Sequence, residues 1–191
     1  MTRTLLAATD FSAPARHALE RAALLAPNHS DTRLTLAHVV CAGALDTLRR
    51  LLPAEAGGME SSLIARAEAQ LAELATALAA RHGCAIDTLV RRGDTLATLT
   101  ELADAGAFDL LVLGARGAHF MRELLVGSTT ERLLRKTRHP LLAVKQRAHA
   151  PYHRILAPVD FSDHCAAAIN AAHAWLPDAE FVLLNVFAVE L

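Results

Sequence analysis

The sequence predicts an α/β protein built around a parallel sheet. The apolar pattern predicts the fold class, and the length of the chain predicts one domain with an additional piece. Short apolar runs alternate with longer segments in which apolar residues recur at helical spacing, as in successive βα units. The chain has 191 residues, enough for one well-packed domain of about 100–150 residues and an additional piece. A segment near the C-terminus repeats the start of the chain, which indicates where that piece begins.

The first half of the chain is expected to hold three strands and two long helices. Ser12 suits the N-cap of the first helix and Pro14 its first turn, while Pro27 and Gly83 stand just after helix ends. Between the second strand and the second long helix, a connection that is long for such a fold contains a short helix at Leu45–Leu52 and a break at Gly57-Gly58. The predicted elements are strands Thr4–Ala8, Arg33–Val40 and Ala85–Arg91, and helices Ala13–Leu25 and Met59–Arg81.

The second half contains a glycine pattern between two strands. The strand predicted at Leu110–Leu113 runs into Gly114, where the pattern G-x2-G-x9-G-[ST] begins. The helix that follows begins at Ser128, and its N-terminal N–H groups and dipole favour an anion. Glycine leaves the backbone open to a ligand, and the guanidinium of Arg116 can lie beside phosphate. The pattern predicts phosphate binding; the other elements expected here are helices Leu96–Ala105 and Ser128–Thr137 and strand Leu141–Val144.

This glycine pattern resembles the ATP-binding branch of the universal stress protein family. The resemblance continues through Glu131–Leu134 and His139–Val144, and it includes Leu5–Ser12, His38-Val39 and Arg92–Asp94. It implies a five-stranded, Rossmann-like parallel sheet of order 3-2-1-4-5 with helices on both faces. In that order the ends of the first and fourth strands meet where the strand order reverses, which is where such sheets bind ligands.

The resemblance also implies a set of nucleotide-binding residues at this reversal point. Ala8, Thr9 and Asp10 would line the adenosine side, and Val39 the adenine. The ribose and phosphates would be held by Leu113, Gly114, Arg116, Gly117, Gly127, Ser128, Thr129 and Thr130.

Several of these residues also have a purely structural interpretation. Asp10 and Ser128 can act as helix-entry residues or as ligand contacts, and both interpretations stay open. Phe11 is expected to pack on the core as a hydrophobic staple. Residues 118–126 are expected to form a small lid, in which His119 and Arg122 are candidates for reaching phosphate.

The internal repeat predicts the organisation of the C-terminal region. Residues Leu5–Ser12 match Ile155–Ser162, and the match continues through pairs such as Ala18 and Ala168. We therefore expect a first domain at 1–146 and an incomplete second repeat, a strand, a helix and a strand, at 152–191. A complete tandem member of the family is much longer, and the sequence leaves open whether the chain ends early.

Composition argues against several other classes of protein. The net charge is −1 and aromatic residues make up 4% of the chain, which disfavours a nucleic-acid surface. The chain has no Gly-Lys pair, which a P-loop requires. Residues 9–13, which follow the first strand, lack the glycines of a dinucleotide-binding domain. No apolar run approaches the roughly 20 residues of a membrane span, and no leader precedes the first strand. The three cysteines, Cys41, Cys84 and Cys165, are widely spaced and are expected to be reduced thiols. With the missing leader and membrane span, they predict a cytoplasmic protein.

The expected function is that of a binding module rather than an enzyme. The sequence predicts a protein that binds ATP with Mg²⁺ and changes partner binding or stability under stress, because no catalytic base is evident at the site. The alternatives are a slow ATPase or self-phosphorylating enzyme, and a nucleotide-free dimerisation scaffold. A homodimer is expected through the edge strand Leu141–Val144, with no nucleic-acid or membrane partner.

Overall fold

The computed structural model describes residues 2–28, 31–51, 56–115 and 128–187 of the chain. These divide into two compact units, Met1–Ala148 and His149–Leu191. None of the described helices is both long enough and apolar enough to cross a membrane.

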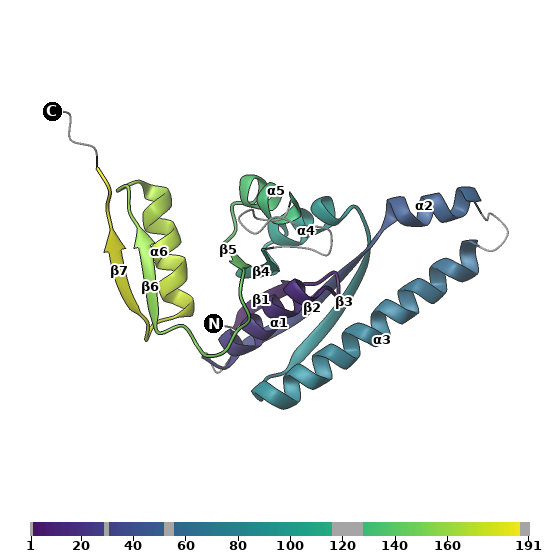
Figure 1. Ribbon diagram of the computed structural model, residues 1–191, viewed down its shortest axis with the longest axis horizontal. Helices are drawn as coiled ribbons and strands as arrows, with labels where there is room; N and C mark the ends of the chain where they lie inside the picture. Colours follow the sequence, from purple (N-terminus) through teal and green to yellow (C-terminus); the bar gives the residue numbers. More distant parts are fainter. Residues whose placement is uncertain (1, 29–30, 52–55, 116–127, 188–191) are drawn as a thin grey trace. The chain divides into compact units, whose positions relative to one another are not determined.

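The first unit contains a five-stranded parallel sheet (Figure 1). Its order is β3-β2-β1-β4-β5, which confirms the order that the sequence predicted. Several central strand residues have no exposed surface, because helices cover both faces of the sheet. The strands are β1 (Arg3–Ala8), β2 (Thr32–Cys41), β3 (Ile86–Gly93), β4 (Leu110–Gly114) and β5 (Leu141–Val144).

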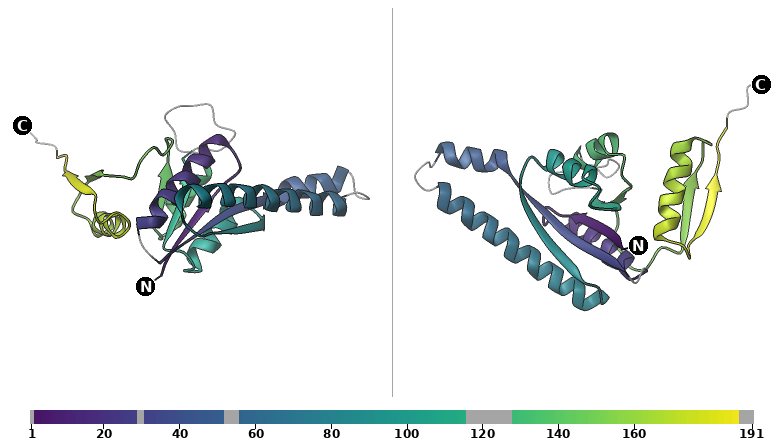
Figure 2. Two further views of the ribbon diagram at one scale, coloured as in Figure 1. Left: turned by 90° about the horizontal axis from the view of Figure 1, so that it is seen from below. Right: turned by 180° about the vertical axis from the view of Figure 1, so that it is seen from behind.

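Two layers of helices cover this sheet. Helices α1 (Ala13–Leu25) and α3 (Ala56–His82) lie against one face, and α4 (Thr95–Asp104) and α5 (Ser128–Lys136) lie against the other (Figure 2). The short helix α2 (Ala42–Leu51) follows β2 directly, and the 3-10 turn η1 (Ala26–Asn28) follows α1. Apolar residues of the sheet and of helices α4 and α5 pack together in one buried cluster: Leu6, Ala37, Leu96, Leu99, Leu111, Leu113 and Leu133.

The helix ends show why the sequence predicted them correctly. The Ser12 hydroxyl accepts a hydrogen bond from the Ala15 N–H at 3.3 Å, as an N-cap should. Gly83 has a φ of +67° and closes the end of α3 by donating its N–H to the Ala79 carbonyl at 2.9 Å. Asp94 is the N-cap of α4, and its side chain accepts a hydrogen bond from a backbone N–H of that helix, as the Ser12 side chain does in α1.

The break predicted at Gly57-Gly58 is wrong, since both glycines lie in the first turn of α3. A glycine costs a helix roughly 1 kcal/mol relative to alanine. Further along α3, Leu71 and its neighbours are buried against the sheet, and this packing outweighs the local cost.

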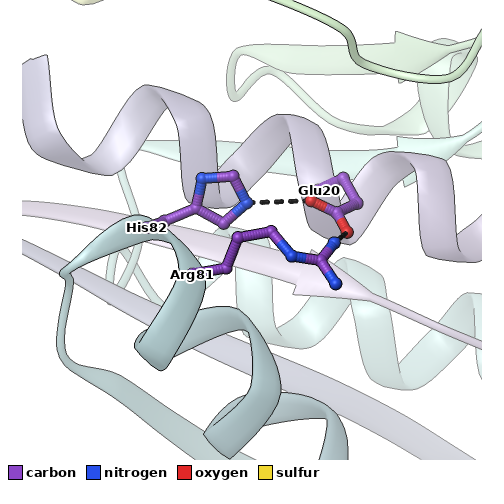
Figure 3. Close-up of polar contacts among 3 residues, drawn as sticks. All are labelled: Glu20, Arg81 and His82. Carbon is purple, nitrogen blue, oxygen red and sulfur yellow. Dashed lines mark hydrogen bonds and ion pairs between the residues drawn. The ribbon is translucent and has the colours of Figure 1, made fainter.

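A charged cluster joins the end of α3 to α1 (Figure 3). Glu20 on α1 accepts a hydrogen bond from the Arg81 guanidinium and lies 2.8 Å from Nε2 of His82. Glu20 and His82 are largely buried, whereas Arg81 is mostly exposed. The cluster therefore fixes α3 beside α1 on this face of the sheet.

The second unit consists of a strand, a helix and a strand. It consists of β6 (Arg154–Pro158), α6 (Asp163–Trp175) and β7 (Glu180–Leu184). β6 and β7 are parallel neighbours in a two-stranded sheet. The Arg154 guanidinium pairs with Glu180 across the two strands at 2.9 Å.

Candidate functional site

The site begins at the sharp turn between β1 and α1. Thr9 is buried: its N–H donates to the Ala37 carbonyl at 2.9 Å, and its hydroxyl accepts from the Phe11 N–H at 2.9 Å. Asp10 accepts a hydrogen bond from the Ser12 N–H at 3.0 Å and is exposed. Phe11 adopts a φ of 64°, which few non-glycine residues do. These bonds hold the turn in one conformation, with Asp10 at its surface.

The ring of Phe11 packs on His38 instead of on the apolar core. Their ring centroids are 4.3 Å apart, and the predicted staple is therefore replaced by a contact with the end of β2. Nδ1 of His38 lies 2.8 Å from the Thr9 carbonyl oxygen. A carbonyl only accepts, so Nδ1 carries the proton. His38 thus supports the turn, a role that its place in an apolar strand did not reveal.

Three predicted site residues belong to one apolar surface. Ala8 and Leu113 are neighbours in the register of β1 and β4. Ala8 and Val39 both pack against the cluster that contains Leu113. The sheet order therefore brings together residues that are far apart in the sequence.

The end of β4 is joined to the start of α5. Thr130 is buried, and its hydroxyl donates to the Gly114 carbonyl at 3.0 Å. The Ala115 N–H donates to the Val144 carbonyl at 2.8 Å. Ser128 and Thr129 are the first two residues of α5. The N-terminus of α5 is thus fixed beside the end of β4, and Thr130 is a structural link between them.

Part of the predicted site lies outside the described residues. This applies to the proposed phosphate ligands Arg116, Gly117 and Gly127, and also to His119 and Arg122 of the expected lid. Within the residues that the structure describes, no three His, Cys, Asp or Glu side chains are grouped to hold a metal ion. The three cysteines are free thiols.

The fold is that of a Rossmann-like α/β protein, in which the strand order reverses between β1 and β4. The sequence pattern of the family described as "Universal stress protein family" matches residues 1–145. The chain belongs to the universal stress protein family.

Relatives of known sequence or structure agree with this assignment. Universal stress protein Sll1654 of Synechocystis sp. is 33% identical over 147 residues, which cover 75% of this chain and 86% of that protein. A universal stress protein solved in complex with cAMP is 25% identical, with a TM-score of 0.54 over 75% of this chain and 96% of that one. A universal stress protein from Archaeoglobus fulgidus is 18% identical and shares the fold, with a TM-score of 0.71 over 97% of this chain and 67% of that one.

Proposed function

We propose that this chain binds ATP where β1 and β4 end, and that the bound nucleotide regulates its stability or its binding to partners. The observation that carries the proposal is the junction of β4 and α5, where the bond from Thr130 to Gly114 fixes a helix N-terminus at the sheet edge. A helix N-terminus favours an anion through its N–H groups and its dipole. The similar structure with cAMP is that of an adenine-nucleotide complex.

The residues around the junction suit the parts of an adenine nucleotide. The partly exposed apolar side chains of Ala8 and Val39 suit the adenosine side and the base. Asp10, exposed at the end of β1, offers a carboxylate to the sugar or the base. The phosphates would be held by the glycine pattern and the start of α5, that is, by Gly114, Arg116, Gly117, Gly127, Ser128 and Thr129. In this proposal Thr9 and Thr130 shape the site, because their polar groups bond to the backbone.

Magnesium would be held mainly by the nucleotide. Mg²⁺ binds through one or two carboxylates and substrate phosphates and keeps several water molecules. Asp10 is an exposed carboxylate at the end of β1, and the described residues offer no three-ligand cluster. The donor set therefore fits a phosphate-bound Mg²⁺ and not a separate metal centre.

Titration calorimetry with a matched pair of variants tests the ATP site. We expect Asp10→Asn to weaken ATP binding about tenfold, because a hydrogen bond to a charged group contributes roughly 1.5 kcal/mol. Asp160→Asn, at the equivalent position of the second unit, should leave the affinity unchanged. Gly117→Val should abolish binding without changing the circular dichroism spectrum. Unchanged affinity in both Asp10→Asn and Gly117→Val would refute the site.

Arg116→Ala separates phosphate recognition from nucleoside recognition. We expect it to weaken ATP more than adenosine, since its proposed partner is a phosphate. Equal losses for the two ligands would remove Arg116 from the phosphate site. One ATP should bind per chain, because the glycine pattern occurs once; two would contradict the assignment.

The two alternative functions make different predictions. A true ATPase should release phosphate at a typical enzymatic rate of about 1–1,000 per second. A nucleotide-free scaffold should yield no adenine nucleotide when the purified protein is denatured and its released ligands are analysed by mass spectrometry. A binding module should release ATP or another adenine nucleotide, with little hydrolysis.

We also propose that two copies pair through β5. Among the described residues, β5 has one strand neighbour, β4, and the carbonyls of Pro140 and Val144 accept bonds from that side. Because backbone groups alternate along a strand, Leu141 and Ala143 direct theirs outward. Ala143→Pro removes one outward N–H and should convert a dimer to a monomer in light scattering, whereas Ala143→Ser should not. A wild-type monomer would refute this pairing.

A further inference from the structure

The second unit contains an apolar groove of about 700 Å³, lined by residues of β6, α6 and β7. Among the residues that line it are Ile155, Ala157, Cys165, Ala168, Ile169 and Ala172. By the internal repeat they correspond, in order, to Leu5, Ala7, Ala15, Ala18, Leu19 and Ala22 of the first unit. Those six residues are all buried. The groove is therefore the open counterpart of a surface that is covered in the first unit.

The first unit shows what covers that surface. There α1 packs on β4 and β5 as well as on β1, so that it extends over the β4 side of β1. In the second unit, α6 lies on the side of β6 away from β7 (Figures 1 and 2). Among the described residues, β6 has a strand neighbour only in β7. Thus α6 overhangs an edge at which Arg154 and Leu156 can pair with one more strand through N–H and carbonyl groups, and Pro158 through its carbonyl alone.

We propose that this groove binds an extended apolar segment, which adds to β6 as a parallel strand in the way that β4 adds to β1. The equivalent edge of β1 is filled by Leu110–Leu113, four consecutive apolar residues, in parallel register. Strand addition of this kind derives its affinity from main-chain hydrogen bonds and its specificity from side-chain pockets. The occupant is thus an unpaired apolar strand from a polypeptide partner.

The start of β6 indicates which residue should precede that strand. In the first unit the Asp109 carboxylate accepts hydrogen bonds from the Thr4 N–H at 2.8 Å and from its hydroxyl at 2.9 Å. The residue equivalent to Thr4 is Arg154, whose guanidinium is largely exposed. An acidic residue before the apolar segment would accept a hydrogen bond from the Arg154 N–H, as Asp109 does from the Thr4 N–H, and would share the Arg154 guanidinium with Glu180, which already pairs with it.

A second copy of the same edge does not suit the groove. If two copies paired their β6 edges antiparallel about a twofold axis, both α6 helices would lie on the same face of the joined sheet. Both helices would then overhang the same two β6 strands. Helices pack no closer than about 8–10 Å, whereas neighbouring strands are about 4.8 Å apart. The space beside β6 therefore accommodates a strand without a helix of its own.

Cys165 provides a direct test, since it lines the groove. In full-length protein with Cys41→Ser and Cys84→Ser, Cys165 is the remaining thiol. The probe is a synthetic peptide with the sequence of Asp109–Gly114, extended by lysines for solubility. We expect a saturating concentration to slow iodoacetamide modification of Cys165 at least tenfold, as measured by mass spectrometry. A peptide with proline at the position of Val112 should not protect, because it cannot pair as a strand.

Two variants of α6 make the test specific to the groove. Ala168→Arg fills the groove and should abolish protection by the peptide, whereas Ala167→Arg, at an exposed neighbour outside the groove, should preserve it. Trp175 and Tyr152 are the single Trp and the single Tyr of the chain. Intrinsic fluorescence therefore verifies that the second unit is folded in each variant. The proposal is overturned if the peptide gives no protection, if the proline peptide protects equally, or if Cys165 is protected by raising the protein concentration alone.

Discussion

The strand–helix–strand segments that begin the two units have the same local structure in different surroundings. Phe11 and Phe161 have φ values of 64° and 62°. Ser12 and Ser162 cap their helices through bonds of 3.3 and 3.2 Å. Yet Leu6 has no exposed surface, whereas its equivalent Leu156 is 61% exposed. Local bonds therefore form this turn and cap without a surrounding core, whereas burial depends on the strands and helices that follow in the chain.

The same turn is supported by different side chains in the two units. His38 bonds to the Thr9 carbonyl at 2.8 Å, and its equivalent Asn185 donates to the Val159 carbonyl at 2.6 Å. The ring of Phe11 rests on His38, whereas Phe161 is 85% exposed. The two side chains thus form hydrogen bonds to equivalent carbonyls, but only the imidazole of His38 also packs against a phenylalanine ring.

The largest expected effect comes from truncating the equivalent leucines. Leu6→Ala should destabilise the first unit by about 2–5 kcal/mol, because it leaves a cavity under α4 and α5. Leu156→Ala should change the stability of the second unit by less than about 0.5 kcal/mol. Denaturation followed by far-UV circular dichroism reports the first change, and Trp175 fluorescence the second. A large cost for Leu156→Ala would show that a partner covers this face in solution.

The Glu20 cluster has no counterpart among the bonds described for α6. Glu20→Ala should destabilise the first unit by about 1–2 kcal/mol, since it leaves the largely buried His82 without its carboxylate. The equivalent residue in α6 is the exposed Asn170, and Asn170→Ala should have an effect within about 0.5 kcal/mol. The measurement is urea denaturation of both variants. Equal costs would mean that α6 is packed against another element.

The helix caps should behave alike in the two units. Ser12→Ala and Ser162→Ala should each cost about 1 kcal/mol, because each removes one bond to a helix N-terminal N–H. Thermal melts monitored by circular dichroism and by Trp175 fluorescence would measure the two effects. If only Ser12→Ala has an effect, the second unit does not melt cooperatively.

The smallest expected effect concerns acid stability of the second unit. A hydrogen bond from the Ser162 hydroxyl, at 2.6 Å, lowers the pKa of Asp160 below its usual value. Because the pKa is lower in the folded than in the unfolded state, the stabilisation is present above the ordinary pKa of aspartate, about 3.9. It is lost as the pH falls through the lowered value. Acid titration of Trp175 fluorescence should show a small transition that Asp160→Asn removes.

The sequence predicted most of the fold because its signals are local. Helix α1 and strand β5 have the predicted bounds, since Ser12 and Pro14 mark one start and His139-Pro140 the other. The glycines at 57 and 58 misled the prediction because burial of α3 further along the chain outweighs their cost. Arg92 and Gly93 belong to β3, where pairing with β2 extends the strand.

The candidate site was predictable only in part. The spacing of glycines and the Asp10 turn point to a place, but the contact of Phe11 with His38 and the bond from Thr130 to Gly114 join residues distant in sequence. No periodic pattern encodes such pairs. The buried hydroxyl of Thr130, for example, has a structural bond that the sequence pattern did not predict.

Apolar periodicity, capping residues and glycine spacing act over a few residues, and the family and the order of the elements could therefore be predicted from the sequence. What each unit buries depends instead on contacts between elements that are distant in the sequence. In the first unit β4 and β5 also pack against α1. Among the described residues of the second unit, the sheet consists of β6 and β7 alone, and no third strand packs against α6. Hydrogen bonds of a turn need only neighbouring residues, but removal of apolar surface from water needs a second surface. That is why Leu6 and Leu156, which are alike in sequence, differ in burial.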